Sequence, residues 1–192
     1  MKALLVIDMQ KSVFTTPRYD KDGVINRINN LASIVRDENG LVIFIQHNGS
    51  VEEDMNQGSK GWEIIDELNV VDNDIKITKT ACDSFFKTDL ESILKEYKVK
   101  DVIITGAVTE LCVDTTFRSC LSKELNVTMI SDGHTTGDRE HLKANLIIQH
   151  HNWTWKNIII PNTNIEVVKT NELITQLKAL HKSNDERHIQ IK

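Results

Sequence analysis

Short runs of Val, Ile and Leu alternate with longer amphipathic segments along the whole chain. This alternation is typical of repeated β-α units, in which a helix follows each strand. Several of the runs are continuous, as expected when helices cover both faces of a parallel sheet. The pattern predicts six strands, at residues 3–7, 41–46, 74–78, 101–105, 126–131 and 157–160.

Between the expected strands, apolar residues recur with helical spacing. Two such sets are Val24, Ile28, Leu31 and Val35, and then Leu90, Ile93, Leu94 and Tyr97. We expect both sets to face the core. The chain has no internal repeat and no linker rich in Pro or Gly, so we predict one α/β domain over residues 1–192 with a loosely held polar tail at 183–192.

The composition and net charge limit which binding partners and which cellular compartment we expect for the protein. The net charge is -5 without a block of Lys and Arg, which argues against nucleic acid or a membrane as the main partner. The opening "MKALLVIDMQ" is apolar for only five residues, too few for a signal peptide or a spanning helix. The three cysteines are odd in number and lack CxxC spacing, which favours free thiols in a reducing compartment. We therefore expect a cytoplasmic protein that binds small molecules or proteins.

Three polar residues follow expected strands, at the edge where open α/β sheets bind ligands. Asp8 ends "ALLVID", Lys79 follows "DIKIT", and Cys112 comes shortly after "DVIIT" and the turn "GAVTEL". Period-2 counting places Lys79 on the same face as Ile75 and Ile77, where a lysine is unexpected. An acid, a cation and a thiol that converge at one edge would form a reaction centre.

Each of these residues also has a plain structural interpretation. Asp8 can cap a strand end, a lysine at such an end usually reaches solvent, and a lone cysteine is more often a small core residue. Cys120 fits that last description. The sequence around Cys82 does not indicate any partner for this thiol, and we interpret Cys82 as structural or incidental. Cys112 differs because it opens the predicted helix, where the helix dipole favours a thiolate.

The sequence resembles the isochorismatase-like cysteine hydrolases, a superfamily that includes nicotinamidases and N-carbamoylsarcosine amidase. The resemblance covers about residues 3–168 through "LLVIDMQKSVF", "GSKGWEI", "ITKTACDSFFKTDL", "ITGAVTELCVDTTFRS" and "TMISDGHTTGD". It implies a three-layer α/β/α, Rossmann-like fold with a six-stranded parallel sheet. It also implies a catalytic triad of Asp8, Lys79 and Cys112, in which Lys79 and the helix N-terminus stabilise the thiolate and Asp8 transfers the proton.

The resemblance implies further site residues. The peptide bond between Ala107 and Val108 would be cis, and the backbone N–H groups of Val108 and Cys112 would form the oxyanion hole. Gly106 tolerates unusual dihedral angles beside that bond. Four residues match positions that wall the substrate pocket in relatives, although each is equally compatible with the core: Gln10, Phe14, Trp62 and Phe86. Leu111 is expected to shape the pocket as well, because it lies beside Cys112. His134 is interpreted as a hydrogen-bonded structural residue.

One departure from the nicotinamidases concerns their metal site, an Asp-x-His pair with another histidine. The matching stretch "IQHNGS" carries His47 in place of the aspartate and Gly49 in place of the first histidine. One imidazole does not make a metal site, so we predict no metal and no other cofactor. Typical isochorismatases lack the nucleophilic cysteine. The expected activity is therefore metal-independent hydrolysis of a small amide, carbamoyl or ureido compound, in a homodimer or homotetramer. The alternatives are a nicotinamidase or isochorismatase activity, an idle binding or assembly protein, or a redox thiol protein.

Overall fold

The computed structural model describes residues 1–189, with side chains described through residue 179. The strands are β1 (Lys2–Ile7), β2 (Leu41–His47), β3 (Ile75–Lys79), β4 (Asp101–Ala107), β5 (Asn126–Thr135) and β6 (Ile165–Val168). The α-helices are α1 (Lys21–Asp37), α2 (Leu90–Glu96), α3 (Asp114–Ser122), α4 (Ala144–Asn157) and α5 (Thr170–Ile189). A 3-10 turn, η1 (Lys11–Phe14), follows β1, and a π-helical turn, η2 (Thr109–Val113), precedes α3.

The six strands form one parallel sheet in the order β3-β2-β1-β4-β5-β6. β1 lies in the middle, where Ala3 pairs with Leu41 on one side and with Val102 on the other. The order reverses direction between β1 and β4, which is where doubly wound sheets place their ligands. The predicted α/β fold with a six-stranded parallel sheet is confirmed.

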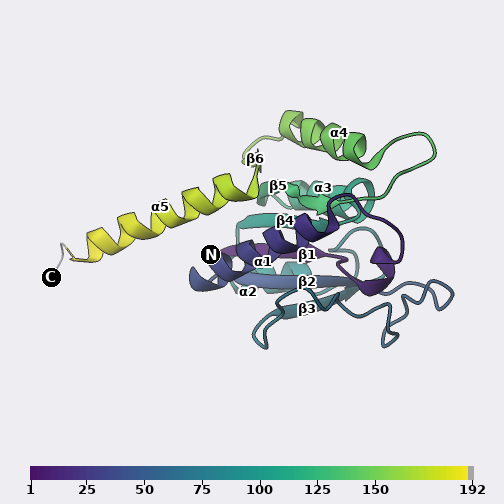
Figure 1. Cartoon of the computed structure of the whole chain (residues 1–192). Coiled ribbons are helices and arrows are strands. Elements are labelled where there is room, and N and C mark those ends of the chain that lie inside the picture. The colour runs from purple at the N-terminus through teal and green to yellow at the C-terminus, as the bar shows by residue number, and fades with distance from the viewer. Residues whose placement is uncertain (190–192) are drawn as a thin grey trace.

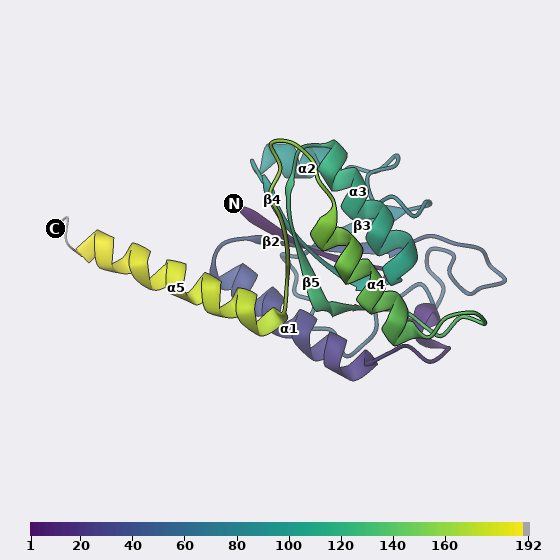
Figure 2. The same ribbon diagram turned by 90° about the horizontal axis from the view of Figure 1, so that it is seen from above.

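Helices cover both faces of the sheet (Figure 1, Figure 2). On one face, α1 and the first part of α5 pack against Leu4 and Val6. On the other face, α2, α3 and α4 pack against Leu5 and Ile7. Successive β1 side chains therefore alternate between two apolar layers, which explains why its sequence is apolar without interruption.

The predicted helix faces agree with the structure except at one residue. Val24, Ile28, Leu31 and Val35 are all buried on α1. On α2, Leu90 and Leu94 are buried and Ile93 packs against the same core. Tyr97 is wrong as a core residue, because it lies just beyond the end of α2 and is exposed.

The sixth predicted strand is also wrong. Residues 157–160 form the end of α4 and the segment after it, and Ile159 is 94% exposed. The strand that pairs with β5 is instead Ile165–Val168. Pro161 follows the apolar "NIII" run and lacks the N–H group that a longer ladder would need. β5 extends four residues beyond its predicted end at Ser131, to Thr135.

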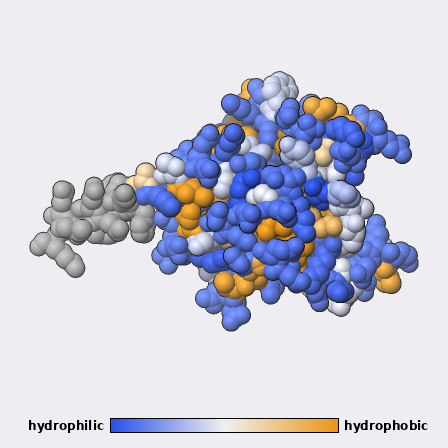
Figure 3. Space-filling model, in the orientation of Figure 1, coloured by the Kyte–Doolittle hydropathy of each residue, from blue (hydrophilic) through white to orange (hydrophobic). Residues whose placement is uncertain are grey.

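The C-terminal helix α5 extends away from the layered body (Figure 1). Its first part packs on α1 through Leu173 and Leu177. The predicted loose tail at 183–192 overlaps the end of this helix, and residues 190–192 lie outside the described part. Across residues 1–189, no helix combines the length and apolar content needed to cross a membrane. The face shown in Figure 3 is mostly hydrophilic, with apolar side chains in separate areas.

Candidate active site

The structure brings Asp8, Lys79 and Cys112 together at the carboxyl edge of the sheet. Asp8 directly follows β1, and Lys79 is the last residue of β3. Cys112 belongs to η2, the turn that follows β4. Because all strands are parallel, their carboxyl ends share one edge, and side chains distant in the sequence meet there.

The ammonium group of Lys79 is the centre of this cluster. Its side chain is fully buried, and its Nζ donates to Asp8 Oδ2 at 2.8 Å and to Cys112 Sγ at 3.2 Å. The backbone carbonyl of Ala81 accepts a third hydrogen bond at 3.1 Å. An ammonium group has three N–H donors, so these contacts can occupy all of them. Lys79 is thereby fixed between the acid and the thiol.

Asp8 is held in a backbone conformation that points its carboxylate into the protein. Its φ of 48° lies in the left-handed region, which Asp tolerates better than most residues, and its N–H donates to Ile45 O at 2.8 Å. The second carboxylate oxygen, Oδ1, is buried and has no hydrogen-bond partner among the described residues. Asp8 therefore retains one oxygen that can accept a proton.

Burial raises the pKa of Asp8, and the charge on Lys79 only partly offsets that effect. The nearby Cys112 thiol lowers the carboxyl pKa as well. Burial lowers the pKa of Lys79, but the charge on Asp8 and the interaction with Cys112 outweigh burial and leave the pKa raised. Lys79 is therefore a stable cation at neutral pH.

Two expectations for Cys112 need correction. Cys112 does not open α3 but is the fourth residue of the π-helical turn η2. Its pKa is raised, whereas the sequence led us to expect stabilisation of the thiolate. Burial and the negative charge of Asp8 cause the increase, and Lys79 offsets only part of it. The resting sulfur therefore keeps its proton at neutral pH.

The segment before Cys112 approaches β1 very closely. A side chain at Gly106 would place its Cβ 2.1 Å from the carbonyl oxygen of Ile7, and the φ of Gly106 is +118°. Only glycine meets both conditions. The peptide bond between Ala107 and Val108 is cis, at the position where the family resemblance places such a bond. The oxyanion-hole roles of Val108 and Cys112 stay predictions.

The expected pocket residues differ in what they can offer a substrate. Phe86 and Leu111 are 49% and 48% exposed, respectively, and are available to a ligand. Phe14 is half-buried, packs against the core and lies under Lys21 Nζ at 5.5 Å. Trp62 is half-buried, and its indole N–H is buried without a partner among the described residues.

The side chain of Gln10 forms hydrogen bonds with the backbone instead of facing a ligand. Its side-chain NH2 donates to the carbonyls of His47 and Trp62, both at 2.9 Å, and its oxygen accepts from the His47 N–H at 2.7 Å. Gln10 is fully buried. In this arrangement it joins the end of β2 to the loop that carries Trp62, so we regard it as a structural residue that shapes the site indirectly.

The two histidines near the site are neutral mainly because burial lowers the pKa of each. Burial and the nearby charge of Lys79 lower the pKa of His47, whose Nδ1 lies 3.5 Å from Lys79 Nζ. His134 is buried, contacts Thr109 Oγ1 at 2.8 Å and Asn152 Oδ1 at 3.1 Å, and has its pKa lowered to about 4 by burial. Within the described residues, no group of three or more His, Cys, Asp or Glu is placed to hold a metal ion.

Sequence reasoning missed two contributors to the site. The Ala81 carbonyl binds Lys79 through the backbone, so no residue type could have indicated it. His47 was considered only in place of a metal ligand, yet it pairs with Lys79 across β2 and β3. Its position at the end of β2 was the available signal.

The fold and the cluster define a class of protein, an α/β/α protein with an acid, a lysine and a cysteine at the switch point of its sheet. The isochorismatase domain family matches residues 2–151, and the chain belongs to this family.

Relatives and a solved structure agree with this assignment. The uncharacterized isochorismatase family protein YrdC of Bacillus subtilis (strain 168) is 31% identical over 135 residues, covering 68% of this chain and 72% of YrdC. Nicotinamidase 3 of Arabidopsis thaliana is 31% identical over 159 residues, or 76% of this chain and 78% of that protein. Ureidoacrylate amidohydrolase RutB of Caulobacter vibrioides is 30% identical over 82 residues, 42% of this chain and 36% of RutB. A crystal structure of an isochorismatase family protein, 31% identical, superposes with a TM-score of 0.77 over 85% of this chain and 96% of that one.

Proposed function

We propose that this protein is a cysteine hydrolase that cleaves the C–N bond of a small amide, carbamoyl or ureido compound. The observation that supports this proposal most directly is the position of the buried Lys79 ammonium group between the Asp8 carboxylate and the Cys112 thiol. A buried lysine is costly unless it is paired, and a plain structural ion pair would not need a thiol as its third member. The relatives named for nicotinamide and ureidoacrylate hydrolysis support this reaction class.

The thiol is activated during attack rather than before it. Because the resting sulfur keeps its proton, Asp8 acts as the general base and removes that proton as Sγ approaches the carbonyl carbon. The unpartnered Oδ1 is the oxygen suited to accept it. Lys79, already hydrogen-bonded to Sγ, stabilises the negative charge that develops on sulfur.

The remaining steps return every proton. The Sγ–C bond forms, and the carbonyl oxygen becomes an oxyanion held by the backbone N–H groups of Val108 and Cys112. Asp8 then gives its proton to the leaving nitrogen, the C–N bond breaks, and a thioester remains on Cys112. Asp8 next takes a proton from water, whose oxygen attacks the thioester. Collapse of that intermediate releases the acid and returns the proton to sulfur.

We propose that this chemistry needs no metal. In place of the aspartate and first histidine of the nicotinamidase metal site, the chain has His47 and Gly49. His47 instead presents its Nδ1 to Lys79. Exhaustive chelation is therefore expected to leave the hydrolysis rate unchanged.

Trapping the acyl-enzyme tests the proposal directly. The protein is mixed with a panel of small amides, carbamoyl compounds and ureido acids, quenched in acid, and its peptides are analysed by mass spectrometry. We expect an acyl adduct on Cys112 with substrates that turn over. Cys112→Ala should lose both adduct and turnover, whereas Cys82→Ala, a matched change at an exposed thiol, should keep both. Turnover by Cys112→Ala would refute the cysteine mechanism. A folded wild type that forms no adduct across the panel would favour an idle binding protein.

A further inference from the structure

Arg18 is a half-buried cation without a hydrogen-bonding partner in the part of the chain that the structure describes. It lies on the loop between η1 and α1, and its Nε is buried with no acceptor. We find no hydrogen bond or ion pair from its guanidinium group to any described residue. A guanidinium group carries five N–H donors, and leaving such groups unsatisfied in a partly desolvated site is unfavourable. Arg18 therefore has the capacity to bind an acceptor from outside the chain.

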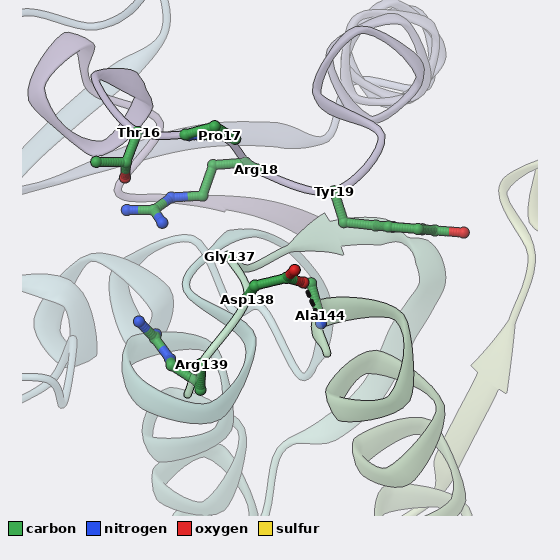
Figure 4. Close-up of a pocket in the computed structure, with 8 residues that line it drawn as sticks. All are labelled: Thr16, Pro17, Arg18, Tyr19, Gly137, Asp138, Arg139 and Ala144. Atoms are coloured by element: carbon green, nitrogen blue, oxygen red, sulfur yellow. Dashed lines mark hydrogen bonds between the residues drawn. The ribbon is translucent and has the colours of Figure 1, made fainter. Parts of the chain in front are cut away.

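A second arginine faces Arg18 across a pocket of about 590 Å³. Arg139 lies on the loop between β5 and α4, and the two side chains reach toward the same side of the pocket (Figure 4). Burial lowers the pKa of Arg18, and the nearby positive charge of Arg139 lowers it further. Two guanidinium groups that repel each other are stabilised by an anion placed between them.

Hydrogen bonds that involve the backbone fix the two loops that form the pocket. The Tyr19 N–H donates to the Thr136 carbonyl at 2.9 Å, and the Thr135 hydroxyl donates to the Tyr19 carbonyl at 2.6 Å. These bonds tie the Arg18 loop to the end of β5. Gly137 completes the fit, because a Cβ there would lie 2.5 Å from Arg18 Nη1.

The local charges indicate the class of ligand. Arg139 is paired with Glu110, whose Oε1 lies 2.8 Å from Nε and 2.6 Å from Nη2. Asp138 is paired with Lys143 at 2.7 Å. The charge of Glu110 also acts on Arg18 and partly offsets the effects of burial and Arg139 on its pKa. The three cations Arg18, Arg139 and Lys143 still exceed the two acids Glu110 and Asp138 by one positive charge, which matches a monoanion better than a phosphate dianion. We propose that Arg18 and Arg139 form a binding site for a carboxylate group.

The site is connected to the turn that carries the thiol. Glu110, which holds Arg139, lies two residues before Cys112 in η2. The loops after β1 and β5 belong to the same sheet edge as Asp8. The carboxylate can therefore belong to the substrate or to a separate small acid, and the first of these possibilities rests on the proposed hydrolase function.

Binding of acetate tests the site without requiring any activity. The full-length protein is labelled with ¹⁵N, and the arginine Nε–H and glycine signals are followed as sodium acetate replaces sodium chloride at constant ionic strength. We expect saturable shifts of the Arg18 and Gly137 signals. Arg18→Gln and Arg139→Gln should each weaken acetate binding by about tenfold or more, as expected for a lost charge-assisted hydrogen bond.

Two further variants make the result decisive. Gly137→Ala, which keeps all charges but displaces the Arg18 guanidinium group, should also weaken binding. Arg118→Gln removes a half-exposed arginine of α3 that does not line the pocket, and this variant should bind acetate like the wild type. The carboxylate site is refuted by the absence of saturable shifts in the folded wild type, by equal acetate affinity in the Arg18→Gln and Arg139→Gln variants, or by saturable binding of phosphate without acetate.

Kinetics then identify the source of the carboxylate. If it belongs to the substrate, Arg18→Gln, which breaks no hydrogen bond or ion pair among the described residues, should raise KM for a ureido acid at least about tenfold more than it raises KM for the matching uncharged amide. If it belongs to a separate acid, added acetate should change the rate for both substrates in the wild type and not in Arg139→Gln. Because acetate titration does not depend on turnover, failure of the hydrolase proposal and failure of the carboxylate site are distinguishable.

Discussion

Asp8→Asn should make Cys112 easier to ionise while strongly slowing hydrolysis. Asparagine keeps the size of the side chain and removes its negative charge. That charge is one cause of the raised thiol pKa, and Lys79, whose Nζ lies 3.2 Å from Sγ, opposes it. Without Asp8 the lysine acts alone on the sulfur. The variant therefore separates thiolate formation from proton transfer, which the wild-type site combines.

The size of the effect follows from the geometry of Lys79. Its Nζ is 2.8 Å from Asp8 Oδ2 and 3.2 Å from Cys112 Sγ, so those two atoms are at most about 6 Å apart. Two negative charges at that separation repel by about 3 kcal/mol at an effective dielectric constant of about 20. One pKa unit corresponds to about 1.4 kcal/mol. The Cys112 pKa should therefore fall by about two units in Asp8→Asn.

Alkylation with iodoacetamide over a range of pH measures this change. The modified Cys112 and Cys82 peptides are quantified by mass spectrometry, and the exposed Cys82 serves as an internal control in the same molecule. In the wild type, we expect Cys82 to react before Cys112 at neutral pH. In Asp8→Asn, the Cys112 profile should move to lower pH. Hydrolysis should fall by about 100-fold or more, because the general base is lost.

Two results would contradict this reasoning. An unchanged or higher Cys112 alkylation pKa in a folded Asp8→Asn protein would show that the carboxylate charge does not control the thiol. Hydrolysis close to the wild-type rate would remove Asp8 from proton transfer, whatever the alkylation data show. Thermal unfolding of both proteins checks that the variant is folded.

Three further predictions follow from the same contacts. Lys79→Met should lower kcat/KM at least about tenfold, because Asp8 loses its ion-pair partner and the pKa of Asp8 rises further. Lys76→Met, at an exposed position of the same strand, is the control and should have no such effect. Gln10→Ala should lower the free energy of unfolding by about 2–4 kcal/mol in urea denaturation, since the N–H and carbonyl groups of His47 both lose this side-chain partner, whereas the Trp62 carbonyl keeps its hydrogen bond from Gln46. A KM effect without this loss would contradict the structural role. The His134 pKa falls from 6.5 to about 4 on folding, so the unfolded chain binds more protons, and the free energy of unfolding should decrease by about 3 kcal/mol as pH falls through this window. His134→Gln should remove this part of the pH dependence. An equal slope of stability against pH in both proteins would refute this role of His134.

The sequence predicted the sheet best where its strands are buried on both faces. β1, β2 and β4 read as unbroken apolar runs because helices cover both sides. β6 was missed because it is a short strand at the edge of the sheet with half-buried side chains, and "IEVV" carries little pattern. The run at 157–160 has a stronger apolar signal, yet Ile159 is almost fully exposed. Apolar content alone does not distinguish these two segments.

The site could be predicted as far as the strand ends determine it. Lys79 ends its strand, and Asp8 and Cys112 follow theirs, so parallel pairing was enough to expect their proximity. The thiol pKa could not be predicted, because its direction depends on how burial and two opposite charges balance in space. Gln10 was assigned to the pocket because its sequence position resembles a pocket residue, whereas its hydrogen bonds depend on β2 and on a loop distant in the sequence.

The central place of β1 has a consequence for the growing polypeptide. β1 is the earliest strand along the chain, yet one of its edges stays uncovered until β4, at residues 101–107, has been synthesised. During that interval the apolar segment 3–7 presents unpaired backbone groups, the condition that promotes pairing with other chains. A ribosome that stalls between β2 and β4 would therefore release a chain prone to aggregate, and this interval is where binding by a chaperone would protect it most.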